Sequence, residues 1–416
     1  MYLTVISDDL TGAADSGSSF TKRGKKLTIY TDDEGKLARQ EEEILSFNLS
    51  TRNTSGVQAR QRHFELCRKL SSMPQSLFMK KIGTGFRGND AFELDGMLSA
   101  MPEFLCFIID NAPQLGTFTL YGNQYCEGEI LTKSLYANDP VLPPTDSCIP
   151  CILSRDTAIP VGQVDVDAVK GGKILERTRE EVETGRRIIV FDAITHSDTL
   201  RIIQTLAPVY PHVFWTGSLG IAEGLGDYLY GTAPENPPRD PRDIRCVCFC
   251  ASAYEMARRQ IAYSEKMGLQ VINLEIDRLL DGDSSFLGTV INQTVEKSLF
   301  GNVILVPKVE KYSYQPGTSR AILNYVRRCA SEICRRAEMD RLVVIGGETA
   351  QTILSELGIH RLELGTQLEP GVAEGKICDG VLSGREFALK GGSVGSEQAL
   401  EKMLCRMQTP EKETKQ

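Results

Sequence analysis

The chain has 416 residues and a formal net charge of −8, with 41% hydrophobic and 25% charged residues, the balance of an ordinary soluble globular protein. An acidic chain argues against nonspecific nucleic-acid binding, and no apolar run is long enough to cross a membrane. The length predicts two or more domains. Because a strand is expected within three residues of the first residue, a signal peptide is not expected, and a cytoplasmic location is predicted.

The first stretch, LTVISDDLTGAADSG from Leu3 to Gly17, predicts a buried strand, a polar turn and a helix that ends near Gly24. Asp8 and Asp9 follow the strand directly, where open α/β sheets bind their ligands. Such carboxylates can accept hydrogen bonds from substrate hydroxyls or take up a proton, so both are candidate catalytic and substrate-binding residues. The alternative is that Asp9 or Thr11 only caps the helix.

A strand at 26–30, an acidic helical stretch ending at 43 and a third strand at 43–49 are predicted next. Arg52 follows the third strand, where its planar guanidinium could bind a carboxylate through two hydrogen bonds. A solvated surface arginine is the commoner alternative. A helix is predicted at 55–70 and a fourth strand at 76–82.

The turn after this fourth strand contains a GxGxxG motif at Gly83, Gly85 and Gly88. The next strand ends at Asp110, so the stretch matches the dinucleotide-binding fingerprint in outline. Glycine is common and the motif short, so a dinucleotide-dependent oxidoreductase is an alternative and not the main hypothesis. Three basic residues, Lys80, Lys81 and Arg87, lie beside or within the motif, and their positive charge suits any anion.

The segment 111–160 is rich in proline and glycine, which predicts hairpins and loops. Helix–strand alternation resumes with a helix predicted at 165–183 and a strand at 187–192, and a strand at 212–215 leads into a helix that ends near 229. Residues 231–243 carry four prolines and no apolar periodicity, so they form the predicted linker. The predicted domains are residues 1–235 and 236–416.

In the second half, strands are predicted at 245–250, 270–274, 302–306 and 342–345, and helices at 255–267, 319–337, 350–357 and 396–403. The predicted fold class is therefore α/β, with two α/β domains, largely parallel sheets and an active site in the interdomain cleft.

Three turns of this second domain lie where a strand is followed by a helix. Glycines there let backbone N–H groups approach an anion, and the helix dipole favours negative charge. The chain has no GxxxxGK[ST] motif, and the alternative is that these glycines only permit tight connections. The candidate cofactor-binding residues are Ser252, Gly346, Gly347, Glu348, Thr349, Gly391, Gly392 and Gly395.

The twelve cysteines are predicted to be free thiols, as is usual in a cytosolic protein. Cys148 and Cys151 have the CxxC spacing of a redox or zinc site, but no second CxxC follows and the chain has four histidines, so no metal site is predicted. Cys246, Cys248 and Cys250 alternate, which predicts one face of a buried strand.

Taken in order, these motifs resemble the four-carbon acid sugar kinase family, which includes kinases of threonate, erythronate and 3-oxo-tetronate. The opening ISDDLTGAADSG, Arg52 and the stretch Lys81–Gly88 match its first half, the last aligning with a KxDSTxRG element. Further matches are Asp139-Pro140, Asp192-Ala193, Gly217-Ser218, Ser252, GGET at Gly346–Thr349, Pro370-Gly371-Val372 and KGGSVG at Lys390–Gly395.

The resemblance implies that the N-terminal domain binds a sugar acid and the C-terminal domain binds ATP with Mg²⁺. The implied reaction is phosphoryl transfer to a hydroxyl of this small molecule, with no nucleic-acid or membrane partner and a homodimer as a possible assembly. A non-catalytic binding relative is the main alternative. The implied substrate-binding residues are Asp8, Asp9, Arg52, Lys81, Gly83, Thr84 and Arg87.

The chain departs from the family pattern mainly on the substrate side. Gly83 stands where the family has an aspartate, Thr84-Gly85 replaces Ser-Thr, and Thr117 stands at a common arginine position. On the nucleotide side, Ala251 and Ala257 replace a glycine and a threonine. The lost acid predicts an acceptor that is bulkier or more acidic than a plain tetronate.

Overall fold

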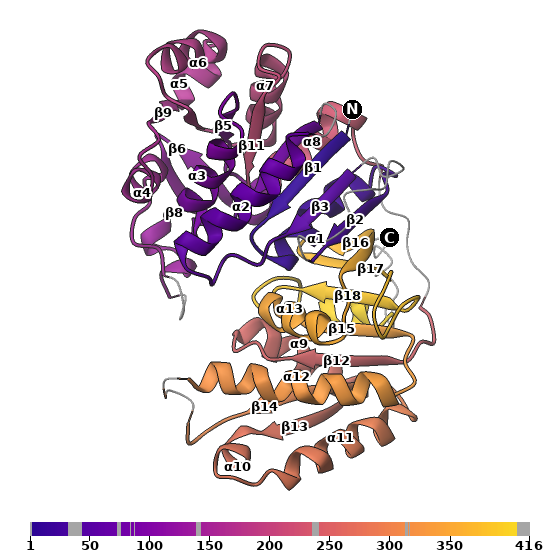
Figure 1. Cartoon of the computed structure of the whole chain (residues 1–416). Coiled ribbons are helices and arrows are strands. Elements are labelled where there is room, and N and C mark those ends of the chain that lie inside the picture. Colours follow the sequence, from indigo (N-terminus) through magenta and orange to yellow (C-terminus); the bar gives the residue numbers. More distant parts are fainter. Residues whose placement is uncertain are drawn as a thin grey trace, which may run out of the picture. The chain divides into compact units, whose positions relative to one another are not determined.

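The computed structural model describes residues 2–31, 44–72, 76–83, 85–86, 88–138, 143–234, 241–312, 315 and 317–405. The chain divides into two compact units, Met1–Pro234 and Glu235–Gln416, and each contains a largely parallel sheet with helices (Figure 1). The predicted fold class, two α/β domains, is confirmed. The cleft expected between the domains stays a prediction.

The sheet of the N-terminal unit has the strand order β2-β3-β1-β4-β11-β5-β10-β9, and all neighbours are parallel. Its inner strands are apolar on both faces, as expected where helices cover a parallel sheet. The strands are β1 Tyr2–Ser7, β2 Leu27–Tyr30, β3 Ile44–Asn48, β4 Ser76–Lys81, β5 Leu105–Ile108, β9 Val161–Val164, β10 Ile188–Phe191 and β11 Val213–Gly217.

The helices of this unit connect the strands in the βα pattern that the sequence predicts. They are α1 Leu10–Thr21, α2 Gly56–Leu70, α3 Asp90–Ala100, α4 Ile149–Asp156, α5 Val166–Lys170, α6 Ile174–Glu183, α7 His196–Leu206 and α8 Leu219–Tyr230. One helix was expected across 165–183, but Gly171 and Gly172 separate α5 from α6, and Gly172 has a φ of +74°. The acidic stretch predicted as helical over 32–43 lies outside the described residues.

The segment 111–160 forms a small antiparallel sheet of β6 Thr117–Leu120, β7 Asn123–Cys126 and β8 Glu129–Ile130, so the predicted hairpins are confirmed. Short 3₁₀ helices cover Pro113–Leu115, Leu131–Lys133 and Leu135–Asn138. Helix α4, which was not expected here, packs Ile149 and Leu153 into the apolar core of the unit. Two buried positions in one eight-residue helix are too few to give a periodic pattern.

The sheet of the C-terminal unit has the order β13-β14-β12-β15-β18-β17-β16, parallel up to β18 and antiparallel beyond it (Figure 1). Its strands are β12 Cys246–Cys250, β13 Gln270–Glu275, β14 Val303–Lys308, β15 Arg341–Ile345, β16 Arg361–Glu369, β17 Val372–Ile377 and β18 Glu386–Lys390. Its helices are α9 Glu255–Lys266, α10 Ile276–Leu280, α11 Ser285–Ser298, α12 Thr318–Arg336, α13 Gly347–Glu356 and α14 Ala399–Met403. Helices α10 and α11 and the β16–β17 hairpin are additions to the predicted elements.

The cysteines differ from the prediction at one place. Cys148 and Cys151 form a disulfide, because the first turn of α4 brings their Cα atoms to 5.2 Å, within the usual range for a disulfide. The ten other cysteines of the described ranges form no disulfide. The alternating cysteines of β12 lie together in the core of the C-terminal unit, as predicted. Among the described helices, none is long and apolar enough to span a bilayer.

Asp192, which follows β10, holds the β6–β7 hairpin on the main sheet. Its carboxylate accepts hydrogen bonds from the backbone N–H groups of Tyr121 at 2.6 Å, Gly122 at 2.8 Å and Val166 at 2.9 Å. Ala193 next to it pairs with Thr119 through two backbone hydrogen bonds. The strand-ending acid is therefore occupied by backbone donors.

We expect Asp192→Ala to lower the free energy of unfolding by about 3 kcal/mol, because partly or fully buried N–H groups lose their acceptor. Urea unfolding followed by circular dichroism measures this. Asp156→Ala, at an exposed position on α4, is the control and should change stability by less than about 0.5 kcal/mol. Equal effects of both substitutions would contradict this account of the hairpin.

Candidate active site

Asp9 is both a helix cap and a member of a charged cluster. It is the N-cap of α1, where its Oδ1 accepts the N–H of Gly12 at 2.8 Å and its Oδ2 accepts the hydroxyl of Thr11 at 2.8 Å. The same Oδ2 lies 2.7 Å from Nη1 of Arg52. Capping, which the sequence left as an alternative, therefore occurs together with an ion pair.

Arg52 also binds Asp8 through two hydrogen bonds. Its Nε lies 2.6 Å from Oδ2 and its Nη2 lies 3.1 Å from Oδ1 of Asp8, whose side chain is 1% exposed. Burial opposes ionisation of Asp8, but the positive charges of Arg52 and Lys80 outweigh it and hold the pKa of this carboxyl well below its usual range. The structure thus brings three predicted site residues together at the carboxyl ends of β1 and β3.

The glycine-rich turn after β4 packs against this cluster. A Cβ at Gly83 would stand 2.8 Å from Nη2 of Arg52, and one at Gly88 would stand 3.4 Å from Oδ2 of Asp8. Because Gly83 and Gly88 have no side chains, the side chains of Arg52 and Asp8 fit against this turn. Thr84 and Arg87, both predicted substrate-binding residues, lie outside the described residues, as does the Asp139-Pro140 landmark.

Asp110 does not suit a dinucleotide ribose. It is fully buried, and its carboxylate accepts hydrogen bonds from the N–H of Ser218 at 3.0 Å and from the side-chain amide of Gln124. Since the acid of the fingerprint is occupied in this way, the geometry does not favour the oxidoreductase alternative.

Lys80 and Lys81 point to opposite faces of β4, and the expectation that both offer charge to an anion is wrong for Lys80. Lys80 is fully buried and its Nζ lies 2.6 Å from Oε2 of Glu93 on α3. Lys81 is 5% exposed, and its Nζ donates to the carbonyl of Ile82 at 2.7 Å. The alternation of side chains along a strand explains the difference.

A second layer of buried ionisable groups lies next to the cluster and is absent from the predicted site. Glu93 accepts a hydrogen bond from the hydroxyl of Thr51, and Nε2 of His63 lies 3.6 Å from its Oε2. Nδ1 of His63 donates to the carbonyl of Ala59 at 2.9 Å. Burial lowers the pKa of His63 to about 4, so the imidazole is neutral at physiological pH.

Asp90, in the first turn of α3, is the other member of this layer. Burial, followed by the negative charges of Glu93 and Asp8, raises the pKa of Asp90 to about 7. One of its carboxylate oxygens, Oδ1, has no hydrogen-bond partner among the described residues. Asp90 and Glu93 are three residues apart at the start of α3 and so share one face of the helix. This spacing is the signal in the sequence that could have indicated them as a pair.

In the C-terminal unit, the three predicted cofactor turns come together. They follow β12, β15 and β18, which are adjacent in the sheet. A Cβ at Gly392 would overlap Oγ of Ser252, and one at Gly346 would lie 3.9 Å from Cβ of Ser252. The N–H of Gly346 donates to the carbonyl of Lys390 at 2.8 Å, so the turns after β15 and β18 are also joined through their backbones.

The start of α13 suits an anion. Gly346, its N-cap, has a φ of +112°, which favours glycine, and no side chain of the described residues caps the first turn. The helix begins at Gly347, Glu348 is exposed and Thr349 is buried. Uncapped N–H groups at a helix N-terminus bind phosphate oxygens readily.

Two side chains that the sequence did not single out hold the loop 391–395. The side-chain amide of Gln260, fully buried on α9, donates to the carbonyls of Val394 at 3.2 Å and Ser396 at 2.8 Å. Glu369 accepts the N–H of Ser396 at 2.6 Å. Single polar residues of this kind carry no motif, so the sequence alone gives no signal for them.

Lys390 is buried at the end of β18, beside the loop. Burial lowers its pKa to about 8, and Cys250 and Glu369 act in the opposite direction. Its Nζ donates to the carbonyl of Gly391 at 2.6 Å. The ammonium group therefore lies within the same turn as the candidate phosphate-binding glycines.

Two family models match the chain. Residues 3–225 match a sugar-binding N-terminal domain, and residues 247–400 match a nucleotide-binding C-terminal domain. Together they define a two-domain protein whose halves bind a sugar and a nucleotide.

Curated relatives narrow this class. The D-threonate kinase of Salmonella typhimurium is 24% identical over 429 residues, covering 97% of this chain and 100% of that protein. The 3-oxo-tetronate kinase of Methylobacterium radiotolerans is 25% identical, covering 89% of this chain and 91% of that protein. The D-erythronate kinase of Heliobacterium modesticaldum is 23% identical, covering 95% of each. The chain belongs to the four-carbon acid sugar kinase family.

Solved structures agree in fold. A crystal structure from Salmonella typhimurium LT2 has a TM-score of 0.80 at 20% identity, covering 96% of this chain and 98% of the other. A Haemophilus influenzae protein has a TM-score of 0.73 at 20% identity, covering 96% of this chain and 99% of the other.

We expect Gly392→Ala to weaken the binding of ATP at least tenfold, because its Cβ would displace Ser252 and reshape the turn. Gly391→Ala is the matched control, since its Cβ would lie at an ordinary 3.4 Å from Val394. Titration calorimetry with ATP measures both affinities, and circular dichroism checks folding. Wild-type affinity for ATP in the folded Gly392→Ala variant would show that this turn is not part of the nucleotide site.

Proposed function

We propose that the protein is an ATP-dependent kinase that phosphorylates a hydroxyl of a small sugar acid, either a tetronate or a bulkier relative. The cluster of Asp8, Asp9 and Arg52 within the sugar-binding domain is the observation that supports this most strongly. Three of the five N–H groups of Arg52 donate to the two aspartates, and within the described ranges the other two remain for the carboxylate of an acceptor. The aspartates can in turn accept hydrogen bonds from acceptor hydroxyls.

In this proposal the acceptor hydroxyl oxygen attacks the γ-phosphorus of ATP, and the bond from that phosphorus to the β,γ-bridging oxygen breaks, so that ADP leaves with that oxygen. The hydroxyl proton passes to Asp8 or Asp9, the candidate catalytic residues. The protein's part is to position the two reactants and to offset the charge that moves during transfer. Ser252, Gly346–Thr349, Gly391, Gly392 and Gly395 would hold the phosphates through backbone N–H groups.

Magnesium, when bound with the nucleotide, would neutralise phosphate charge. In the ranges that the structure describes, no group of three or more His, Cys, Asp or Glu side chains could hold a metal ion. Mg²⁺ that is bound with a nucleotide takes most of its ligands from phosphates and waters. The homodimer and the cytoplasmic location stay predictions.

A panel assay tests the proposal. The protein is mixed with Mg²⁺-ATP and with D-threonate, D-erythronate, 3-oxo-tetronate and larger sugar acids, and ADP release is measured. We expect turnover with at least one acid well above the rate without acceptor. If ATP binds by calorimetry and no acid of the panel gives ADP, the non-catalytic relative is the better description.

We expect Gly83→Asp to change acceptor preference. The new carboxylate would stand beside Arg52 and compete with the acceptor for it, at a cost of about 1 kcal/mol, or roughly fivefold in kcat/KM, for the native acceptor. Activity on threonate or erythronate should rise relative to it. Gly83→Ala, which adds the Cβ without the charge, is the control. If the wild-type protein already prefers threonate or erythronate, the specificity hypothesis is wrong.

The affinity for an anionic acceptor should depend on pH through Asp90. As the pH rises through about 7, Asp90 gains a negative charge beside Asp8 and Arg52 and repels the acceptor carboxylate. We expect KM for the sugar acid to rise roughly fivefold between about pH 6 and 9. The isosteric Asp90→Asn should show no such rise. A parallel rise in both proteins would assign the effect to another group.

A further inference from the structure

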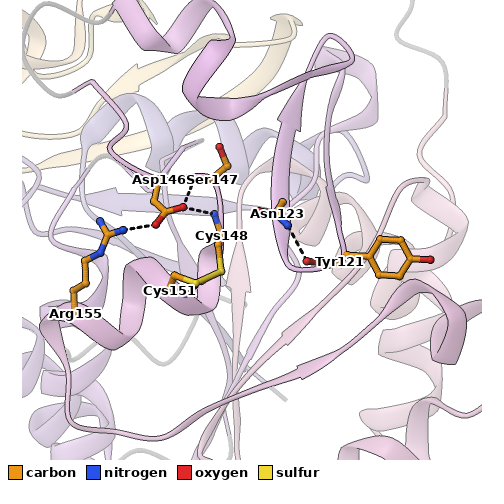
Figure 2. Close-up of a disulfide and its surroundings, with 7 residues drawn as sticks. All are labelled: Tyr121, Asn123, Asp146, Ser147, Cys148, Cys151 and Arg155. Carbon is orange, nitrogen blue, oxygen red and sulfur yellow. Dashed lines mark hydrogen bonds and ion pairs between the residues drawn. A yellow bond between two sulfur atoms is a disulfide. The ribbon is translucent and has the colours of Figure 1, made fainter.

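The disulfide of Cys148 and Cys151 is not part of the proposed kinase site. It lies at the N-terminus of α4, with Cys148 as the N-cap and Cys151 exposed on the first turn (Figure 2). The ten other described cysteines are buried or half-buried, so Cys151 is the one exposed cysteine of the described residues. Its chemistry therefore calls for a separate explanation.

A role in stabilising the fold explains the disulfide poorly. It closes a loop of only two intervening residues, which constrains the unfolded chain far less than a long loop does. Both neighbouring segments are already anchored without it. Ile149 and Leu153 lie in the core, and the N–H of Ile149 donates to the carbonyl of Gly122 at 2.8 Å.

The local structure favours a thiolate at Cys148. Its Sγ accepts the N–H of Cys151 at 3.3 Å, and the N-terminus of a helix stabilises negative charge. The nearby carboxylate of Asp146 accepts the N–H of Cys148 at 3.1 Å and is paired with Arg155, so its charge is compensated (Figure 2). Cys148 is thus the better leaving group, and exposed Cys151 is the sulfur that an incoming thiolate can reach.

We propose that Cys148 and Cys151 form a redox-active dithiol–disulfide couple that exchanges electrons with a dithiol protein of the thioredoxin class. A thiolate of the partner attacks Sγ of Cys151, the S–S bond breaks and its electron pair leaves on Cys148. The partner's second cysteine, as a thiolate, then attacks the partner's first sulfur, which is bonded to Cys151 in the mixed disulfide. A disulfide forms within the partner, and Cys151 leaves as a thiolate. The couple gains two electrons and two protons, and the partner's dithiol becomes a disulfide.

The surroundings connect this couple to the sheet. The carbonyl of Ser147, next to Cys148, accepts the N–H of Gln124 at 2.8 Å, and the side chain of Gln124 donates to Asp110 after β5. Hydrogen bonds through Gln124 therefore connect the residue next to Cys148 with Asp110 at the carboxyl end of β5. In a reducing compartment, where a cytoplasmic chain would reside, disulfides are usually transient and redox-active.

The test uses the full chain, oxidised in air, with bacterial thioredoxin, its reductase and NADPH. We expect one equivalent of NADPH to be consumed and mass spectrometry to show two new free thiols on Cys148 and Cys151, with an unchanged circular dichroism spectrum. A thioredoxin variant without its resolving cysteine should be trapped on Cys151. With iodoacetamide, the reduced Cys148 should be alkylated at lower pH than half-buried Cys378, the internal reference.

Cys148→Ser with Cys151→Ser is the matched variant and should stay folded while consuming no NADPH. Resistance of the native pair to thioredoxin would overturn the proposal, as would trapping on Cys148. If the native chain unfolds when the disulfide is reduced, the disulfide has a structural role instead. Failure of the double variant to fold would then have the same explanation.

Discussion

The ion pair of Arg52 with Asp8 and Asp9 determines the geometry of the candidate sugar site. Asp8 is buried, and a buried carboxylate stays charged only where a partner replaces the hydration it has lost. Arg52 provides that partner from the loop after β3, and the N–H of Thr51 in the same loop donates to the Asp8 carbonyl at 2.9 Å. Side chain and backbone together therefore hold the ends of β1 and β3 in one arrangement.

Beneath this pair, Lys80 and Glu93 form a second ion pair that never reaches solvent. His63 beside it is neutral, so the Lys80–Glu93 pair has no third charge from the imidazole, and Asp90 adds a negative charge to the layer only as the pH rises through about 7. Removing either partner would leave the other buried and uncompensated, which is strongly destabilising. Lys80 and Glu93 thus stabilise the charged cluster of the candidate sugar site, although neither needs to contact an acceptor.

The sequence predicts the elements of the sheets well, and it also predicts which candidate site residues lie together, because both depend on local patterns. Asp8, Asp9, Arg52, the turn at Ser252 and the glycine turns 346–349 and 391–395 all follow strands, and the structure brings them together within their own domains. It predicts poorly what depends on tertiary contacts. Glu93 is one of many helix acids until Lys80 turns inward to meet it.

The CxxC pair is a second case. Its spacing permits a disulfide, a metal site or two thiols, and only the turn of α4 decides among these. Helix α4 itself escapes prediction because the surrounding prolines and glycines indicate loops. Gln260 and Glu369 are missed because their roles depend on tertiary contacts with a loop that is distant in sequence.

The strand order of the C-terminal unit has a consequence for biosynthesis. β18 is the last strand along the described part of the chain, yet it pairs with β15 in the interior of the sheet, and the loop 391–395 follows it. During translation, β12, β13, β14 and β15 leave the ribosome with one edge of β15 unpaired until β18 arrives. A chaperone that binds exposed strand edges would therefore act on this unit late, and a prematurely terminated chain would lack the loop 391–395, a candidate nucleotide-binding turn.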